Sequence, residues 1–382
     1  MIGYYEQKHH LYDTMLKAFV AKEVKPHAAD IDEREVFPHD TVKKMAALGM
    51  LGVPFKDYDG AGGDEVAYAQ TVLSLSKACA TTGVIVSAHT SLCSWPIHAF
   101  GSDDQKARYL PKLNRGEWLG AFALTEPSAG TDAGAQKTVA VPEGEGYRLN
   151  GTKIFITNAG VADLYVILAM TNPELKTKGI SAFLVEATFE GFRVGKKEKK
   201  LGIRGSSTCE LILDNVYVPK ENLLGKVNQG FKIALATLDG GRIGIAAQAV
   251  GIAEGAIDEA IKYVKERQQF NRPIAHFQHT QFALAQMETQ KEAAKHLTFY
   301  AARLKQEGKP YSQAAAQAKL FAAQVAMDVT TQAVQLLGGY GYTREYPLER
   351  MMRDAKITEI YEGTNEAQKM VIASHLLRGG AR

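Results

Sequence analysis

The segment GRIGIAAQAVGIAEGAIDEAIKYVKE, residues 241–266, carries apolar residues at steps of three and four. Steps of this size place side chains on one face of an α-helix, so they predict one long helix with a single apolar stripe. The stripe consists of Ile243, Ala246, Val250, Ala253, Ile257, Ile261 and Val264. Further helical stretches follow at 279–305, at 312–337 and after YEGTNEAQ at 361–368. Together these stretches predict a helix bundle at the C-terminal end of the chain.

The region before this bundle, residues 118–224, has no helical stripe. It contains short runs such as AFAL at 121–124, KIFITN at 153–158 and LYVILAM at 164–170, which alternate with Gly, Pro and Asn turns. This pattern predicts a β domain of sandwich or barrel type.

The first part of the chain, up to about residue 116, is again helical in pattern. Met45, Leu48 and Leu51 have helical spacing, and Ser102 followed by Gln105 forms a capping box that starts a helix. We therefore expect an α+β protein with an N-terminal helical domain at 1–117, a middle β domain at 118–226 and a C-terminal helical bundle at 227–382.

Composition excludes several classes of function. The chain has 382 residues and a formal net charge of +3, which gives no electrostatic reason to expect a nucleic-acid partner. Cys79, Cys93 and Cys209 are odd in number and form no CxxC pair, so we expect no disulfide framework and a reducing compartment. His276 and His279 could share a helix face, but no acidic or cysteine cluster completes a ligand set. We therefore expect no metal site.

The longest stretch without a formal charge, residues 78–102, contains several Thr, Ser and His residues. Because such groups are costly in hydrocarbon, we expect a buried core helix here and no membrane span. The first fifteen residues carry charges and tyrosines where a secretory signal would have an apolar core. We expect a cytoplasmic bacterial protein or, for a processed chain, one of the mitochondrial matrix.

Common cofactor and nucleophile signatures are missing: the chain has no GxGxxG, no GxxxxGK[ST] and no GxSxG. A different segment, AFALTEPSAGTDAGA at 121–135, leads a strand into a turn rich in Gly, Ser and Thr. Its hydroxyls and backbone N–H groups suit a polar ring edge or a pyrophosphate. The same composition is also typical of a plain β-turn.

Two segments near the C-terminus also stand out. QLLGGYGYTREYPLERMMRD at 335–354 places glycines at a helix end and then alternating charges, which also fits a helix cap followed by a solvated face. In IYEGTNEAQ at 360–368, Glu362 precedes Gly363 and then Thr364 or Asn365, either of which can cap the next helix. Taken alone, Glu362 could simply be a carboxylate that favours a helix N-terminus.

In combination, these segments resemble the acyl-CoA dehydrogenase family over essentially the whole chain, in the same helical, β, helical order. Two family signatures are complete, at 123–132 and at 335–354, and KIFITN, LDGGRIGIAAQ at 238–248, ERQQFNRPI at 266–274 and IYEGT at 360–364 accompany them. Within the family the chain is most similar to short-chain (butyryl-CoA) dehydrogenases, with short/branched-chain enzymes next.

The resemblance implies an oxidoreductase of fatty acid β-oxidation, and hence of lipid metabolism. Such flavoproteins use FAD to convert a short-chain acyl-CoA thioester to the trans-2-enoyl-CoA and pass the electrons to electron-transfer flavoprotein. It also implies a homotetramer in which neighbouring subunits share the FAD. Alternatives are a short/branched-chain acyl-CoA dehydrogenase, an acyl-CoA oxidase or flavin monooxygenase-like enzyme of the same fold, and a catalytically silent binding protein.

The resemblance also assigns residues. Glu362 matches the catalytic base, and Gly241 stands where some relatives carry the base instead. Many relatives have Trp where Phe155 stands, so flavin stacking can differ. The substrate-binding matches are Thr131, Asp239, Arg242, Tyr361 and Gly363. The cofactor-binding matches are Phe122, Leu124, Thr125, Gly130, Thr131, Phe155, Ile156, Thr157, Arg267, Gln278, Gln335, Gly338, Gly339, Thr364 and Glu366.

Overall fold

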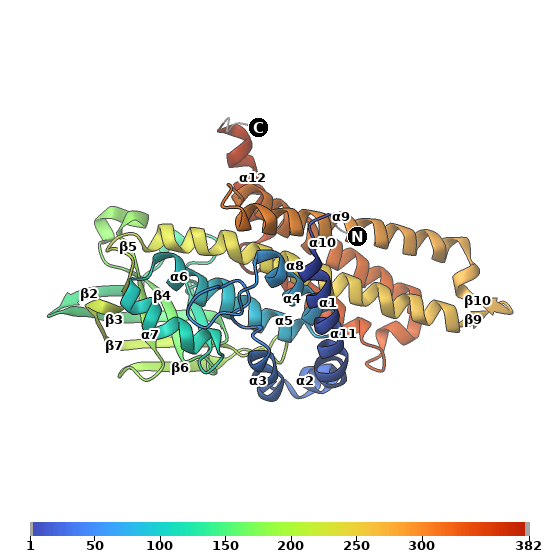
Figure 1. Ribbon diagram of the computed structural model, residues 1–382, viewed down its shortest axis with the longest axis horizontal. Helices are drawn as coiled ribbons and strands as arrows, with labels where there is room; N and C mark the ends of the chain where they lie inside the picture. Colours follow the sequence, from blue (N-terminus) through green and yellow to red (C-terminus); the bar gives the residue numbers. More distant parts are fainter. Residues whose placement is uncertain (1–2, 379–382) are drawn as a thin grey trace.

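The computed structural model describes residues 3–378 of the chain. A β domain lies at one end, a long helical bundle extends to the other, and the N-terminal helices pack against both (Figure 1). The N-terminal elements are α1 (Gln7–Phe19), η1 (Val20–Val24), η2 (Lys25–His27), α2 (Ala28–Arg34), α3 (His39–Ala47), α4 (Glu65–Ala78), α5 (Ala80–Ser87), η3 (Ala88–Ser94), α6 (Trp95–Phe100) and α7 (Asp103–Asn114).

For the N-terminal helical region, two predictions made from the sequence are confirmed and one is wrong. The capping box of α7 is present, because Ser102 Oγ accepts from the Gln105 N–H and Gln105 Oε1 accepts from the Ser102 N–H. The uncharged stretch forms the largely buried α5, η3 and α6, and no described helix is both long and apolar enough to span a bilayer. The helix expected across Leu48 and Leu51 instead ends at Ala47, because Gly49 turns the chain with φ +71°.

The middle domain is one strand-paired sheet of eight strands that folds into two halves. They are β1 (Gly120–Ala123), β2 (Val139–Glu143), β3 (Gly146–Thr157), β4 (Leu164–Met170), β5 (Ile180–Glu186), β6 (Phe192–Lys197), β7 (Thr208–Pro219) and β8 (Leu223–Leu224). The strand order is β6-β7-β3-β2-β4-β5-β8, with β1 parallel to β4. Three short helical turns complete the domain: η4 (Ala133–Ala135), η5 (Pro173–Gly179) and η6 (Lys220–Asn222).

The two halves of the sheet pack face to face. A single residue pair, Val139 with Met170, joins β2 to β4, so the sheet turns a corner at that point. Across the resulting core the Tyr165 ring lies 4.7 Å from the Phe192 ring, and Tyr147 lies 5.1 Å from Phe183. These contacts between opposite halves confirm the predicted sandwich.

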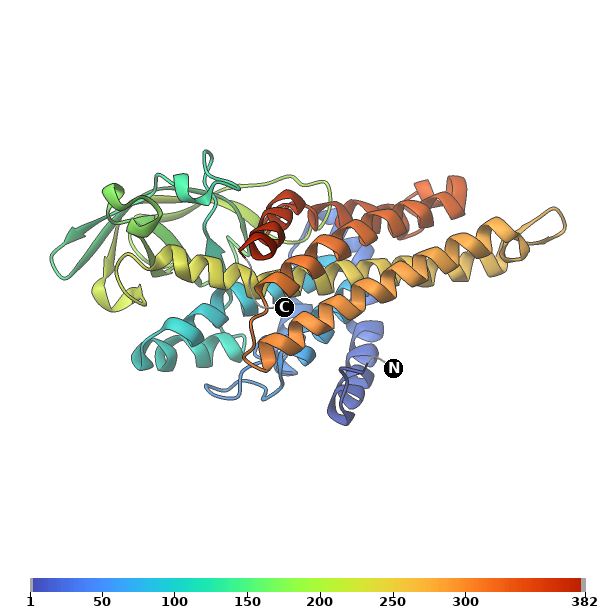
Figure 2. The same cartoon turned by 90° about the horizontal axis from the view of Figure 1, so that it is seen from above.

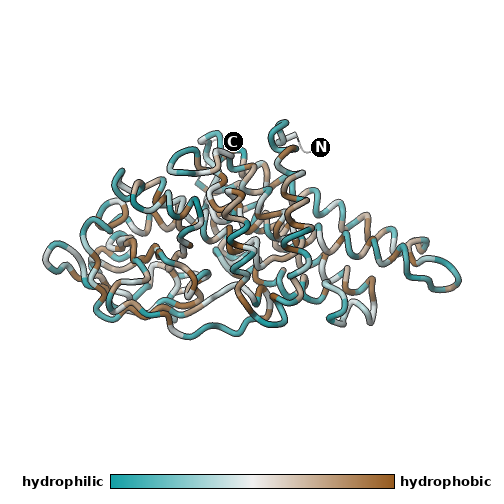
Figure 3. Tube along the Cα trace, turned by 60° about the horizontal axis from the view of Figure 1, so that its bottom comes forward, coloured by the Kyte–Doolittle hydropathy of each residue, from teal (hydrophilic) through white to brown (hydrophobic). Residues whose placement is uncertain are grey.

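The C-terminal bundle is built around one long helix, as its apolar stripe predicts. Helices α8, α9 and α10 run side by side, and a hairpin closes the far end (Figure 2). The hydrophobic segments gather where the central helices meet, while this hairpin is hydrophilic (Figure 3). The elements are α8 (Gly230–Glu266), β9 (Gln268–Gln269), β10 (Arg272–Pro273), η7 (Ile274–His276), α9 (Gln278–Gln306), α10 (Ser312–Leu337), η8 (Gly338–Tyr342), α11 (Leu348–Ile357) and α12 (Asn365–Leu377).

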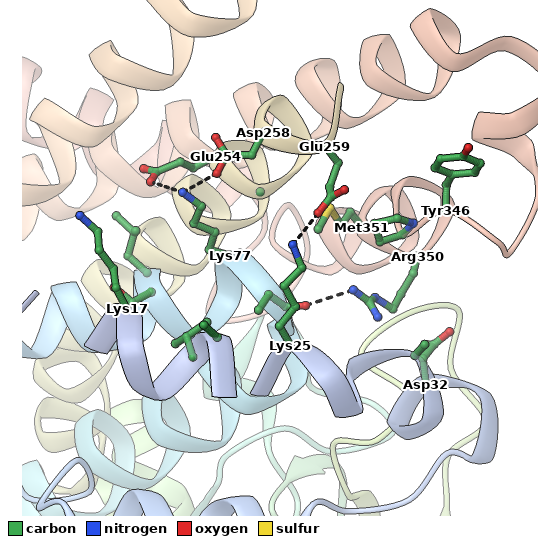
Figure 4. A pocket seen from close by; sticks show the side chains of 18 of the residues that line it. Lys17, Lys25, Asp32, Lys77, Glu254, Asp258, Glu259, Tyr346, Arg350 and Met351 are labelled. Atoms are coloured by element: carbon green, nitrogen blue, oxygen red, sulfur yellow. Dashed lines mark hydrogen bonds and ion pairs between the residues drawn. The ribbon is translucent and has the colours of Figure 1, made fainter. Parts of the chain in front are cut away.

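Helix α8 contacts all three parts of the chain, and glycines mark its close approaches. A methyl group at Gly230 would overlap the Ser181 backbone of β5, and one at Gly251 would overlap the Leu73 carbonyl oxygen of α4. A groove of about 830 Å³ lies between α1, α2, α4, α8 and α11 (Figure 4). Ion pairs such as Lys77–Glu254, 3.0 Å, cross this groove from α4 to α8.

We predict that Gly251→Ala destabilises the protein. Helix propensity favours alanine over glycine by about 1 kcal/mol, but the added methyl group would collide with the α4 backbone at Leu73. Overpacking of this kind costs about 1–3 kcal/mol, and we expect this cost to exceed the gain in helix propensity. Thermal unfolding followed by circular dichroism should show a lower Tm. An unchanged or higher Tm would contradict the close packing of α4 on α8.

Candidate active site

Glu362 lies in the turn between α11 and α12, held in an unusual backbone conformation. Its φ is +50°, and Gly363 follows with φ +92°. A left-handed conformation is costly for a glutamate and is found where surrounding contacts enforce it. Here Gln368 donates from Nε2 to the Gly363 carbonyl at 2.9 Å, and the Asn365 N–H donates to the Glu359 carbonyl at 2.9 Å. The turn therefore presents the Glu362 side chain in a defined direction.

The Glu362 carboxylate lies against α8 at Gly241. A methyl group on Gly241 would overlap Glu362 Oε2, so the carboxylate in this position uses the space that glycine leaves open. Oε2 is buried and has no hydrogen-bond partner among residues 3–378. An unpartnered buried oxygen of this kind is what a substrate-facing base requires before its substrate arrives.

Burial controls the charge of this carboxylate. It raises the pKa of Glu362 to about 8, while the positive charges of Lys319 and Arg242 act in the opposite direction. A base whose pKa lies near neutral pH can both accept and release a proton at a useful rate. The site therefore has the proton chemistry of a general base.

The predicted substrate residues Asp239 and Arg242 lie on α8 beside this turn. Asp239 Oδ1 accepts from Arg242 Nη1 and, at 2.9 Å, from the Ser312 hydroxyl of α10. The Arg242 Nε atom is buried and unpartnered within the described residues, so it can serve a ligand. On the other side of Glu362, the Tyr361 hydroxyl donates to Gln248 Oε1 of α8.

A second cluster lies where β1 and β3 end. The Ile154 N–H donates to the Thr125 carbonyl at 3.0 Å, which brings the turn after β1 beside residues 154–157. Phe155 has φ +58° and leaves 60% of its surface exposed. A bulky aromatic residue in the left-handed region marks stored strain, and its open face can stack on a planar ring. Phe122 is buried within β1, and Gly130 and Thr131 lie on the exposed part of the turn.

This cluster rests on a buried ion pair that the sequence analysis missed. Lys153 Nζ donates to Glu126 Oε1 at 2.7 Å and to the Leu124 carbonyl at 3.0 Å. Glu126 also accepts from the backbone N–H groups of Lys137 and Thr138. Glu126 lies in the turn after β1, within the quoted 121–135 motif, and Lys153 lies in β3, but no rule of spacing in sequence connects these two segments.

A third set of predicted cofactor residues is brought together elsewhere. Arg267, Gln335, Gly338 and Gly339 line a pocket of about 520 Å³ beside the hairpin that ends the bundle. Gln278 begins α9 nearby. The β1–β3 cluster belongs to the β domain, which lies at the opposite end of the molecule from this hairpin (Figure 1). A single chain therefore does not bring the predicted cofactor residues of the β1–β3 cluster together with those beside the hairpin.

The remaining two predicted residues lie at the start of α12. Thr364, and not Asn365, caps this helix, because its Oγ1 accepts from the Ala367 N–H at 3.2 Å. Glu366 is exposed in the first turn of the same helix.

Comparison with known proteins shows the family. Family models described as the N-terminal, middle and C-terminal domains of acyl-CoA dehydrogenase match residues 6–117, 121–216 and 228–377. The chain belongs to the acyl-CoA dehydrogenase family, an oxidoreductase family whose cofactor is FAD.

Individual relatives are similar over nearly their full length. The chain is 60% identical to "Acyl-CoA dehydrogenase, short-chain specific" of Clostridium acetobutylicum, over 95% of this chain and 96% of that protein. Butyryl-CoA dehydrogenase from Megasphaera elsdenii superposes with a TM-score of 0.96 and 48% identity, covering 98% of this chain and 99% of that one. A structure from work on the electron transferring flavoprotein of Acidaminococcus fermentans superposes with a TM-score of 0.97 and 52% identity, covering 98% and 99%.

We predict that Glu362→Gln stabilises the protein at high pH. The folded-state pKa of about 8 exceeds the ordinary value of 4.5, so the folded state holds this proton more tightly than the unfolded state. The free energy of unfolding of the wild type therefore falls as pH rises from about 4.5 to about 8, whereas glutamine removes this loss. The Tm of the variant relative to wild type should rise between about pH 5 and pH 8.5.

A suitable control is Glu366→Gln, because this nearby glutamate is exposed and its pKa is lowered. Its Tm difference should not grow over the same pH range. A pH-independent Tm difference for Glu362→Gln would mean that the carboxylate is not desolvated.

Proposed function

We propose that this protein is an FAD-dependent dehydrogenase of short-chain acyl-CoA thioesters that forms the trans-2-enoyl-CoA. One observation carries the proposal: the buried, unpartnered Oε2 atom of Glu362 faces α8 at Gly241, and the pKa of this carboxyl is raised to about 8. The 60% identity to a relative named short-chain specific supports the substrate class.

Glu362 removes the α proton of the acyl chain in this proposal. Its burial weakens the solvation of the carboxylate, which makes it a stronger base than an exposed glutamate. A backbone N–H group of the same turn would polarise the thioester carbonyl by donating a hydrogen bond to its oxygen. Bound FAD supplies the acceptor for the hydride that leaves the β carbon.

Two chains are needed to complete a cofactor site in this proposal. Phe122, Leu124, Thr125, Gly130, Thr131, Phe155, Ile156 and Thr157 would hold the flavin of their own chain, with Thr364 and Glu366 nearby. Arg267, Gln278, Gln335, Gly338 and Gly339 would reach the FAD of a neighbouring chain, because they lie at the far end of the bundle (Figure 1). This separation supports a homo-oligomer, for which we propose a tetramer.

The substrate would lie across α8 and the turn that carries Glu362. Asp239 and Arg242 on α8 would contact the substrate through charged groups that can form hydrogen bonds, and Tyr361 and Gly363 flank Glu362 in the chain. Thr131 would approach the CoA portion from the turn after β1.

The domain limits proposed from sequence, after residues 117 and 226, fall in the connections between α7 and β1 and between β8 and α8.

We further propose electron-transfer flavoprotein as the acceptor of the electrons, supported by the similar structure that comes from work on such a protein. The proposed compartment is the bacterial cytoplasm or, for a processed chain, the mitochondrial matrix. Cys79, Cys93 and Cys209 are all free and buried, which agrees with a reducing environment.

The first test is an absorbance spectrum of the purified protein followed by anaerobic addition of butyryl-CoA. We expect a flavin band in the wild type that bleaches with butyryl-CoA. Glu362→Gln should keep FAD and bind the thioester but bleach slower by several orders of magnitude, because an amide cannot accept the α proton.

Other outcomes separate the alternatives. Faster bleaching with isobutyryl-CoA or 2-methylbutyryl-CoA would favour a branched-chain enzyme, and rapid oxygen consumption during turnover would favour an oxidase. A flavin that responds to no acyl-CoA, or no flavin after reconstitution with FAD, would contradict the proposal. Wild-type turnover by Glu362→Gln would remove Glu362 from the mechanism.

We predict that Arg242→Ala weakens substrate use and leaves the flavin in place. Its guanidinium contacts Asp239 and faces the site from α8, whereas the β1–β3 cluster does not depend on it. Steady-state kinetics should show a raised KM for butyryl-CoA, with an unchanged ratio of flavin to protein absorbance. Loss of FAD from this variant would instead place Arg242 in the cofactor site.

A further inference from the structure

Lys319 of α10 is a fully buried lysine directly behind the turn that carries Glu362. It has 0% relative exposure, and its ammonium donates to the Gly363 carbonyl at 2.7 Å and to Asn365 Oδ1 at 3.4 Å. Within the part of the chain that the structure describes, it has no carboxylate within 4.0 Å. Other buried lysines differ in this respect: Lys153, Lys291 and Lys305 pair with Glu126, Glu288 and Glu65.

The contact at Gly363 bears on the strained part of the turn. Glu362 and Gly363 both have positive φ, and the Gly363 carbonyl comes immediately after them. This carbonyl accepts from Lys319 Nζ on one side and from Gln368 Nε2, at 2.9 Å, on the other. A charge-assisted hydrogen bond is stronger than a neutral one, so Lys319 contributes the stronger of the two restraints.

Charges from several elements face this site. Lys319 on α10 and Arg242 on α8 both favour the ionised form of Glu362, and Lys319 has the larger effect. Burial lowers the pKa of Lys319 to about 8, against the opposing effects of Glu362, Glu359 and Glu366. The neighbouring hydroxyls, Tyr361 of the same turn and Tyr68 of α4, have raised pKa values and stay neutral. Lys319 and Glu362 therefore titrate as a coupled pair.

We propose that Lys319 is a positioning residue for the base: its ammonium holds the Glu362–Gly363 turn through the Gly363 carbonyl and supplies positive charge that favours the ionised form of Glu362. The inference rests on the proposed role of Glu362. It assigns to α10 a part in proton abstraction, although Lys319 touches neither substrate nor cofactor.

The test replaces Lys319 in the FAD-loaded enzyme and follows two quantities. Lys319→Met removes both charge and donor, whereas Lys319→Gln removes the charge and keeps a donor for the Gly363 carbonyl. Lys291→Met is the matched control, since it removes a buried lysine of the bundle whose partners are Glu288 and Glu292. The first quantity is the pKa of the Glu362 carboxyl in the resting enzyme, from infrared spectra assigned by difference against Glu362→Gln. The second is the pH profile of kcat/KM with butyryl-CoA.

Both Lys319 variants should raise the pKa of Glu362 by about one unit, the lower end of the effect of a nearby opposite charge. The acid limb of the kcat/KM profile should move upward by the same amount. At pH values below both pKa values, kcat/KM should then be about tenfold lower than in wild type. At high pH, Lys319→Gln should recover more activity than Lys319→Met, because the glutamine can still donate a hydrogen bond to the Gly363 carbonyl and hold the turn that carries Glu362. Lys291→Met should match wild type throughout.

A Glu362 titration and pH profile like those of wild type in both Lys319 variants would overturn the inference. So would loss of FAD from both variants while Lys291→Met stays loaded, because Lys319 would then be a structural residue only. The infrared titration does not depend on turnover. If wild type ignores butyryl-CoA but the infrared shift is present, the proposed function fails and the coupling of Lys319 to Glu362 stands.

Discussion

The close approach of α8 to its neighbours ties the three parts of the chain together. This one helix touches the β domain near Gly230, the Glu362 carboxylate at Gly241, and α4 at Gly251 and Gly255. At each point a methyl group would overlap a neighbouring atom. Each glycine inside a helix costs about 1 kcal/mol relative to alanine. The packing of α8 against α4, α9 and α10 compensates, since helices in proteins gain most of their stability from such contacts.

The same close packing creates the chemistry of the site. Because Gly241 has no side chain, Glu362 Oε2 lies against the helix surface, buried and without a hydrogen-bond partner among the described residues. Desolvation then raises the pKa of Glu362, and the positive charges of Lys319 and Arg242 oppose this effect. The packing of α8 therefore also sets the acid–base behaviour of Glu362, because the contact that brings α8 to the turn removes water from the Glu362 carboxylate.

Buried charges organise the two halves of the site in different ways. Near β1 and β3, Lys153 and Glu126 form a direct ion pair whose remaining hydrogen bonds go to the backbone of the cofactor-side turn. Near Glu362, Lys319 contacts a carbonyl and leaves the carboxylate free. The direct ion pair with Lys153 keeps Glu126 ionised. Lys319 contacts the neighbouring Gly363 carbonyl instead, so the Glu362 carboxylate is still able to take up a proton.

The order of helical, β and helical parts, the apolar stripe of α8, and the signatures that carry Glu362, Arg242 and Phe155 could all be predicted from the sequence. These features are local, because periodicity, turn residues and short motifs act within a few residues of one another. The end of α3, which Gly49 sets, and the choice of Thr364 as the cap of α12 were not predicted. Three relations could be seen only in the folded chain: Lys153 pairs with Glu126, Lys319 lies behind Glu362, and Gly241 makes room for the Glu362 carboxylate. Those relations join residues far apart in the chain, and they depend on how closely two backbones approach, which no spacing in sequence measures.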